Sequence, residues 1–147
     1  MLLLLAGCDD PCRPGEEPTL RLGAGLVEFA ELDGELLLEA GPQGGLHTWL
    51  AVAATDLSTT DPWRVELRGL WGGTVIADAR PVADASCQRE IAEQQAVGLQ
   101  LIWVVDPAAV PSADDLDGEL VDVDVVVTDA AGTRVSDRAV AVMLRSP

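Results

Sequence analysis

The sequence predicts one all-β domain, folded as a sandwich of antiparallel strands. Short runs in which apolar and polar residues alternate recur from Thr19 to the end of the chain, and this period of two is typical of strands with one buried face. Turn residues, mainly Gly and Asp, separate the runs at short intervals. No run shows a convincing apolar face with helical spacing. Many short strands with frequent turns favour two packed sheets.

Composition and charge agree with a single globular domain. At 147 residues, of which 48% are hydrophobic, the chain is long enough to bury a core. The 25 acidic residues stand against nine basic ones, all arginine, which gives a formal net charge of −16. This charge repels other polyanions, so we expect no nucleic-acid binding and no electrostatic docking on anionic lipid. The simplest interpretation of the acidic residues is a solubilising surface.

The chain opens with MLLLLAGC, in which Leu5-Ala6-Gly7-Cys8 resembles the lipobox of bacterial lipoproteins. In that family an aliphatic residue and two small residues precede an invariant cysteine. The resemblance implies that Cys8 carries a lipid, that residues 1–7 are removed as a signal peptide, and that the protein is anchored to the inner or outer membrane of the bacterial cell envelope. No basic residue precedes Cys8 and the apolar stretch is short for a signal peptide, so we expect translation to start upstream of Met1. The alternative is a leucine-rich start with a free cysteine.

Residues 8–18 are rich in proline, glycine and acidic side chains and show no periodicity. This composition is typical of an extended linker. We therefore expect a lipidated tether that holds the β-domain, residues 19–147, off the membrane surface.

The alternating runs predict eight strands, with a short leading strand near Leu20–Leu22. In Val121–Val127, for example, every second residue is valine, so the valines share one face. The runs 47–55 and 97–105 are apolar on both faces, which indicates central strands. The eight predicted strands are 26–32, 35–40, 47–55, 64–70, 74–80, 97–105, 119–128 and 133–144.

Three turns join neighbouring strands. Asp33-Gly34 predicts a two-residue hairpin, and Gly72-Gly73 predicts another. Asp129–Gly132 suits a type I turn closed by a glycine bulge. The polar connection near 85–95 is short and is the one candidate for a helix.

Size and strand pattern favour an immunoglobulin-like topology of about 7–9 strands. In that fold a Trp on the third main strand packs between the sheets, and Trp49 is our candidate for it. The flanking core cysteines of the immunoglobulin family are absent. The ending VDVDVVVTDAAGTRV resembles the last hairpin of bacterial Ig-like modules.

Once Cys8 is lipidated, Cys12 and Cys87 remain. An exported protein meets oxidising conditions, and an even remainder of cysteines predicts a disulfide between the tether and the domain. Such a bridge closes a long loop and contributes about 2–4 kcal/mol. The alternative is two free thiols that do not meet.

The stretch Gly41–Trp49 contains the single histidine of the chain, His47. His47 and Trp49 are two residues apart on a predicted strand, so they share a face. One interpretation makes His47 a ligand or proton-transfer group at a glycine-lined entrance. The other, which we favour, is that the glycines form a turn and both side chains pack. No second His or Cys stands at a spacing that would complete a metal site.

The acidic segment Ala113–Glu119 raises a calcium hypothesis. Asp115 and Asp117 fit the third and fifth places of an EF-hand loop. However, Ala113 occupies the first ligand place, and Asp124 stands where a bidentate Glu belongs. We therefore favour an acidic surface loop and expect no metal and no cofactor.

Motifs for nucleophilic catalysis, phosphate loops and dinucleotide binding do not occur in the sequence. We interpret the chain as a non-enzyme, a lipid-anchored binding or assembly module with an envelope protein partner. The alternative is a small-ligand or calcium-binding sandwich, with Trp63 and Trp71 as its ligand platform or the Asp115 loop as its metal site.

Overall fold

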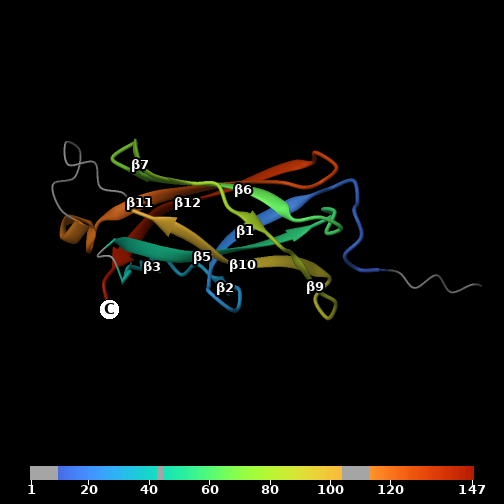
Figure 1. Cartoon of the computed structure of the whole chain (residues 1–147), viewed down its shortest axis with the longest axis horizontal. Helices are drawn as coiled ribbons and strands as arrows, with labels where there is room; N and C mark the ends of the chain where they lie inside the picture. Colours follow the sequence, from blue (N-terminus) through green and yellow to red (C-terminus); the bar gives the residue numbers. More distant parts are fainter. Residues whose placement is uncertain (1–9, 43–44, 104–112) are drawn as a thin grey trace, which may run out of the picture.

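The computed structural model describes residues 10–42, 45–103 and 113–147. Two β-sheets pack face to face and form the two layers seen in Figure 1. Cys8 and the expected signal peptide lie outside the described residues. Within the described part of the chain, no helix has the length and apolar character needed to cross a membrane.

One layer, here called sheet A, is centred on β5. Its strand order is β2 (Ala30–Glu31), β1 (Thr19–Ala24), β5 (Leu46–Thr55), β10 (Glu93–Ile102) and β9 (Ser86–Gln88), and β4 (Glu39–Ala40) also pairs with β5. All of these pairs are antiparallel.

The other layer, sheet B, is centred on β11. Its strand order is β3 (Glu35–Leu37), β12 (Arg134–Arg145), β11 (Leu120–Thr128), β6 (Trp63–Trp71) and β7 (Thr74–Ala79), and β8 (Val82–Ala83) also pairs with β6. A 3₁₀ turn, η1 (Ala113–Leu116), precedes β11. The pair between β3 and β12 is parallel, whereas the other strand pairs of the described residues are antiparallel, as predicted.

The strand order is that of an immunoglobulin-like sandwich. In that arrangement strands A, B, E and D form one sheet and G, F, C and C′ form the other. The orders β1-β5-β10-β9 and β12-β11-β6-β7 match these two series, and the strands occur in the corresponding sequence order. With β3 they make nine strands, and the two-residue strands β2, β4 and β8 bring the total in the described residues to twelve.

The core lies between the sheets and comes from residues in alternation. Val121, Val123, Val125 and Val127 are all at most 1% exposed on β11, as their period of two predicts. Burial of each such side chain contributes roughly 1.5–3 kcal/mol relative to its exposure. The facing sheet supplies Leu50, Val52, Leu99 and Leu101.

The core tryptophan of the third main strand is Trp63, not Trp49. Trp63 opens β6, is fully buried, and donates its indole Nε1–H to the carbonyl oxygen of Ser58 at 2.7 Å. Trp49 is half-buried on the outer face of β5. The run 47–55 is apolar on both faces, so its pattern did not reveal which face Trp49 takes. Trp63 stands in phase with the buried Val65 and Leu67, and this phase was the usable signal.

The segment 35–40 does not form one strand. Residues of β3 pair with β12 in sheet B, whereas β4 pairs with β5 in sheet A. The segment therefore crosses from one layer to the other at Leu38, whose side chain is 1% exposed. The hairpin predicted at Asp33-Gly34 is consequently wrong, because β2 and β3 lie in different sheets. The run 26–32 contributes only the two residues of β2.

The connection near 85–95 is not helical. It contains β9, a turn at Arg89–Ala92 and the start of β10. Ser86, Cys87 and Gln88 pair with Gln95, Gln94 and Glu93, so the polar pattern belongs to a sheet edge. The hairpin at Gly72-Gly73 and the turn at Asp129–Gly132 are present as predicted.

Candidate functional site

The N-terminal segment is fastened to the domain by a disulfide. Cys12 and Cys87 are bonded, with their Cα atoms 5.8 Å apart and a separation of 75 positions in sequence. Cys12 is 4% exposed. The predicted pair is therefore present, and it joins the segment before β1 to the edge strand β9.

Hydrogen bonds hold the same segment in place. The buried Gln94 donates from Nε2 to the carbonyl oxygens of Cys12, at 2.7 Å, and of Leu57, at 2.5 Å, while its Oε1 accepts from the backbone N–H of Leu57. Asp56 accepts from the N–H groups of Gly15 and Glu17, both at 3.1 Å. Residues 10–18 thus dock on the domain, which corrects the expectation of an extended tether for that part of 8–18.

Asp10 is the third residue of the disulfide cluster. Its carboxylate and the two sulfurs lie within 4.8 Å of one another, the one such group found among the described residues. Because both sulfurs are used in the disulfide, they do not offer the thiolates that bind metals. Asp10 instead accepts the backbone N–H of Cys12 at 3.0 Å.

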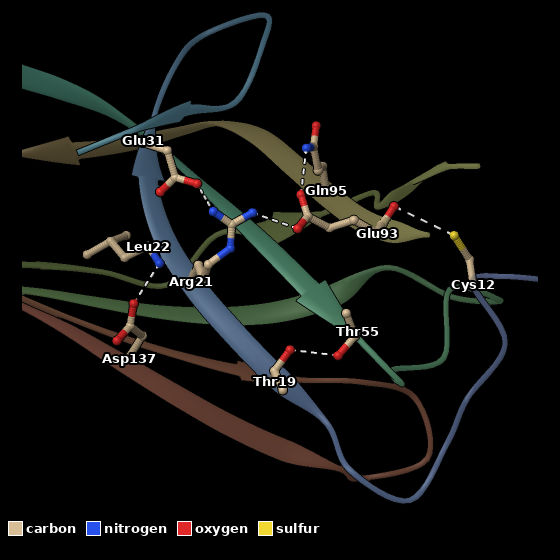
Figure 2. A network of polar contacts seen from close by, with 9 residues as sticks. All are labelled: Cys12, Thr19, Arg21, Leu22, Glu31, Thr55, Glu93, Gln95 and Asp137. Atoms are coloured by element: carbon tan, nitrogen blue, oxygen red, sulfur yellow. Dashed lines mark hydrogen bonds and ion pairs between the residues drawn. The ribbon is translucent and has the colours of Figure 1, made fainter. Parts of the chain in front are cut away.

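A second polar cluster stabilises the outer face of sheet A (Figure 2). Arg21 on β1 forms ion pairs with Glu31 and Glu93, and Gln95 donates to Glu93 at 3.0 Å. Burial raises the pKa of the Glu93 carboxyl, but the hydrogen bonds from Gln95 and Arg21 and the charge of Arg21 outweigh burial and hold that pKa below its ordinary value. The guanidinium of Arg21 also stacks over Phe29, 5.1 Å from the ring centre.

Figure 2 also shows how the two sheets are tied at the β1 edge. Asp137 on β12 of sheet B accepts the backbone N–H of Leu22 on β1 at 2.7 Å. Within sheet A, the hydroxyls of Thr19 on β1 and Thr55 on β5 are 2.6 Å apart. The residues of Figure 2 are thus engaged with one another and serve the architecture.

His47 and Trp49 share the outer face of β5, as predicted. Their rings meet edge to face with centres 5.2 Å apart. His47 Nε2 lies 3.7 Å from a carboxylate oxygen of Glu39. Two shallow hollows flank the pair, one at His47 and Ile102 and one at Trp49 and Leu37. The arrangement is a partly apolar surface with one imidazole and one neighbouring carboxylate.

Trp63 and Trp71 do not form a ligand platform, which corrects that hypothesis. Trp63 is enclosed in the core. Trp71 stands at the opposite end of β6, half-buried, with its Nε1–H donated to Glu119 at 3.2 Å. They stand at the two ends of a nine-residue strand, about 26 Å apart at the usual rise per residue.

The acidic segment before β11 is used structurally. Asp117 accepts the backbone N–H of Ser146 at 2.8 Å, and Gly118 donates to the carbonyl oxygen of Leu144 at 2.7 Å. The segment begins with the 3₁₀ turn η1 and is followed by a strand, unlike an EF-hand loop, which two helices flank.

Arginines gather on the outer face of sheet B, which sequence reasoning missed. The register places Arg64, Thr128 and Arg134 in one row across β6, β11 and β12. Two rows further along, Arg68, Asp124 and Arg138 stand side by side. The signal in sequence was the placement of Arg64, Arg68, Arg134 and Arg138 on the polar phase of two predicted strands.

The arginine face contains an open hollow of about 550 Å³. Arg64, Arg80 and Arg134 line it, together with Thr128 and the turn at Gly132. Guanidinium groups are planar forks that bind carboxylate and phosphate oxygens in pairs. Chemically, this hollow is suited to an anion.

A scan against protein-family models finds no matching family, and a search of curated proteins finds no related sequence.

Proposed function

We propose that this chain is a non-catalytic binding module, held at a membrane of the bacterial cell envelope by a lipid on Cys8. The observation that carries the proposal is the Cys12–Cys87 disulfide. Structural disulfides form and persist in oxidising compartments and are rare in the cytosol. The disulfide therefore supports the export that the resemblance to a lipobox implies.

The position of the disulfide also bears on anchoring. Cys12 follows Cys8 by four residues, and four extended residues span at most about 14 Å. A lipid on Cys8 would thus keep the domain close to the membrane surface. Stable anchoring requires more than one acyl chain, which bacterial lipoproteins carry.

The anchor is tested by expressing the gene from its native locus in its own host. Mass spectrometry of the mature N-terminus is expected to show an acylated Cys8, and the chain is expected in the membrane fraction. Cys8→Ser should move it to the soluble fraction. Cys87→Ser is the control, because it breaks the disulfide and leaves Cys8 available for acylation. An unmodified Cys8 on a chain that stays soluble would contradict the anchor.

The binding role is tested by site-specific crosslinking in intact cells. A photoreactive residue at Ser136, on the exposed face of β12 in sheet B, is expected to give a covalent adduct of defined mass with an envelope protein. The control position is Glu90, in the exposed turn before β10. Adducts at both positions alike, or at neither, would contradict a specific contact through sheet B.

A further inference from the structure

The charge of the molecule is strongly segregated. Five of its nine arginines lie on or beside the outer face of sheet B: Arg64, Arg68, Arg80, Arg134 and Arg138. Four acidic side chains accompany them there: Glu66, Asp78, Asp122 and Asp124. The remaining four arginines share the rest of the chain with the other 21 of its 25 acidic residues. One face is thus close to neutral or positive on a protein of net charge −16.

The arginines of this face differ in how they are engaged. Asp124 accepts two hydrogen bonds from Arg138 and raises the pKa of that guanidinium through those bonds and its charge. Arg134 pairs with Glu66 at 3.3 Å. Arg64 has no ion-pair partner within the described ranges, although acidic residues outnumber basic ones in the chain.

The sheet register brings Arg64 and Arg134 toward the same point. They flank Thr128 on neighbouring strands, so their Cα atoms are about 10 Å apart. Thr128 is short, which leaves room above it for two long side chains to converge. Arg80, beyond the end of β7, lines the same hollow from a third side.

We propose that the hollow between Arg64, Arg80 and Arg134 binds a compact oxyanion, a phosphate or carboxylate group carried by a small molecule. A compact anion interacts mainly with charges within a Debye length, about 10 Å at 0.1 M salt. Here those charges include three guanidinium groups, together with the carboxylates of Glu66 and Asp78, which pair with Arg134 and Arg80. An extended polyanion or an anionic membrane would also meet the acidic remainder of the molecule and be repelled.

Glu66 acts as an internal competitor in this arrangement. Its carboxylate occupies Arg134 and also borders the hollow. A bound oxyanion must share Arg134 with Glu66 or displace it. Removal of the Glu66 charge is therefore expected to strengthen anion binding, whereas loss of Arg64 or Arg134 weakens it.

The test is isothermal titration calorimetry on the full chain with its disulfide intact, at low salt. Inorganic pyrophosphate is the phosphate probe, and citrate is the carboxylate probe. Arg64→Gln and Arg134→Gln are expected to weaken binding of the preferred probe about tenfold, and Glu66→Gln to tighten it severalfold. Arg89→Gln, an exposed arginine in the turn before β10, removes the same charge outside the hollow and should leave the affinity nearly unchanged.

The two probes also identify the ligand class, because the one that binds more tightly names the group. No heat with either probe would overturn the proposal, as would equal weakening by Arg89→Gln and Arg64→Gln. Binding to vesicles of anionic phospholipid without binding of either probe would overturn it in favour of membrane docking. The proposal rests on the binding role suggested above and not on the lipid, so anion binding by a chain that is never acylated would leave it standing.

Discussion

Ala141 adopts a backbone conformation that disfavours every residue with a Cβ. Its φ is 52°, at the bulge where β12 shifts register against β11. The backbone N–H of Ala141 is donated to Asp122 at 2.9 Å, which fixes the bulge. Across it the buried side chains change from odd to even positions, so that Val142 and Leu144 enter the core.

Ala141→Gly is therefore expected to stabilise the protein by about 0.5–1 kcal/mol, because relief of the left-handed strain exceeds the entropic cost of glycine. Urea denaturation measures the difference. Ala139→Gly, on the same strand before the bulge, is the control and should destabilise by a similar amount. Loss of stability in both variants would show that the strain at Ala141 is not relieved.

Glu93 links stability to pH. Its pKa in the folded protein lies below the ordinary value of 4.5, so the folded state favours its ionised form. The contribution is fully present above that ordinary value and is lost as the pH falls through the lower, folded pKa. Wild type is thus expected to be more stable than Glu93→Gln at neutral pH, with the gap closing in acid. A stability difference between the two proteins that stays the same from neutral to acidic pH would contradict this link.

For single residues, the sequence predicted which side chains interact better than it predicted which face of a strand they occupy. The pair His47–Trp49 and the bond Cys12–Cys87 were predicted from spacing and cysteine number. The burial of Trp63 was missed, although its phase with Val65 and Leu67 pointed inward. The arginine hollow could not be predicted, because Arg64 and Arg134 meet only through the register of three strands.

Strands with a clean alternation of apolar and polar residues were predictable, whereas the segment that crosses from one sheet to the other was not. Strands β6, β7, β11 and β12 begin and end within two residues of their predicted bounds. The run 35–40 was divided wrongly, because one apolar segment serves two sheets and its sequence does not record the crossing at Leu38. The start of β10 was missed because Gln94 is polar yet fully buried.

The docked N-terminal segment depends on its covalent link to β9. That strand has three residues, all paired with β10. Replacing both Cys12 and Cys87 with serine is expected to lower the free energy of unfolding by about 2–4 kcal/mol, since the bond closes a long loop. Hydrogen exchange at residues 86–88 should accelerate most. Gln88→Leu is the control, since among the described residues its side chain forms a hydrogen bond to Ser86 alone. Unchanged exchange in the serine variant would mean that hydrogen bonds alone hold the segment.

The whole molecule carries a formal charge of −16, so its many acidic side chains repel one another. Salt should therefore raise the melting temperature at neutral pH, as the added ions screen this repulsion over about 10 Å or less. Differential scanning calorimetry across a sodium chloride series measures the effect. Near the sequence pI of about 4.1 the same series should give little change. A salt response of equal size at both pH values would contradict an electrostatic origin.

The disulfide at β9 also decides how the domain bears mechanical load. A pull on the residues before Cys12 divides between two routes, along the chain into β1 and across the sulfurs into β9. These strands lie on opposite sides of the β5–β10 pair. Tension from the N-terminal side thus reaches both flanks of sheet A together, and β1 cannot be peeled away one hydrogen bond at a time while the sulfur bond lasts.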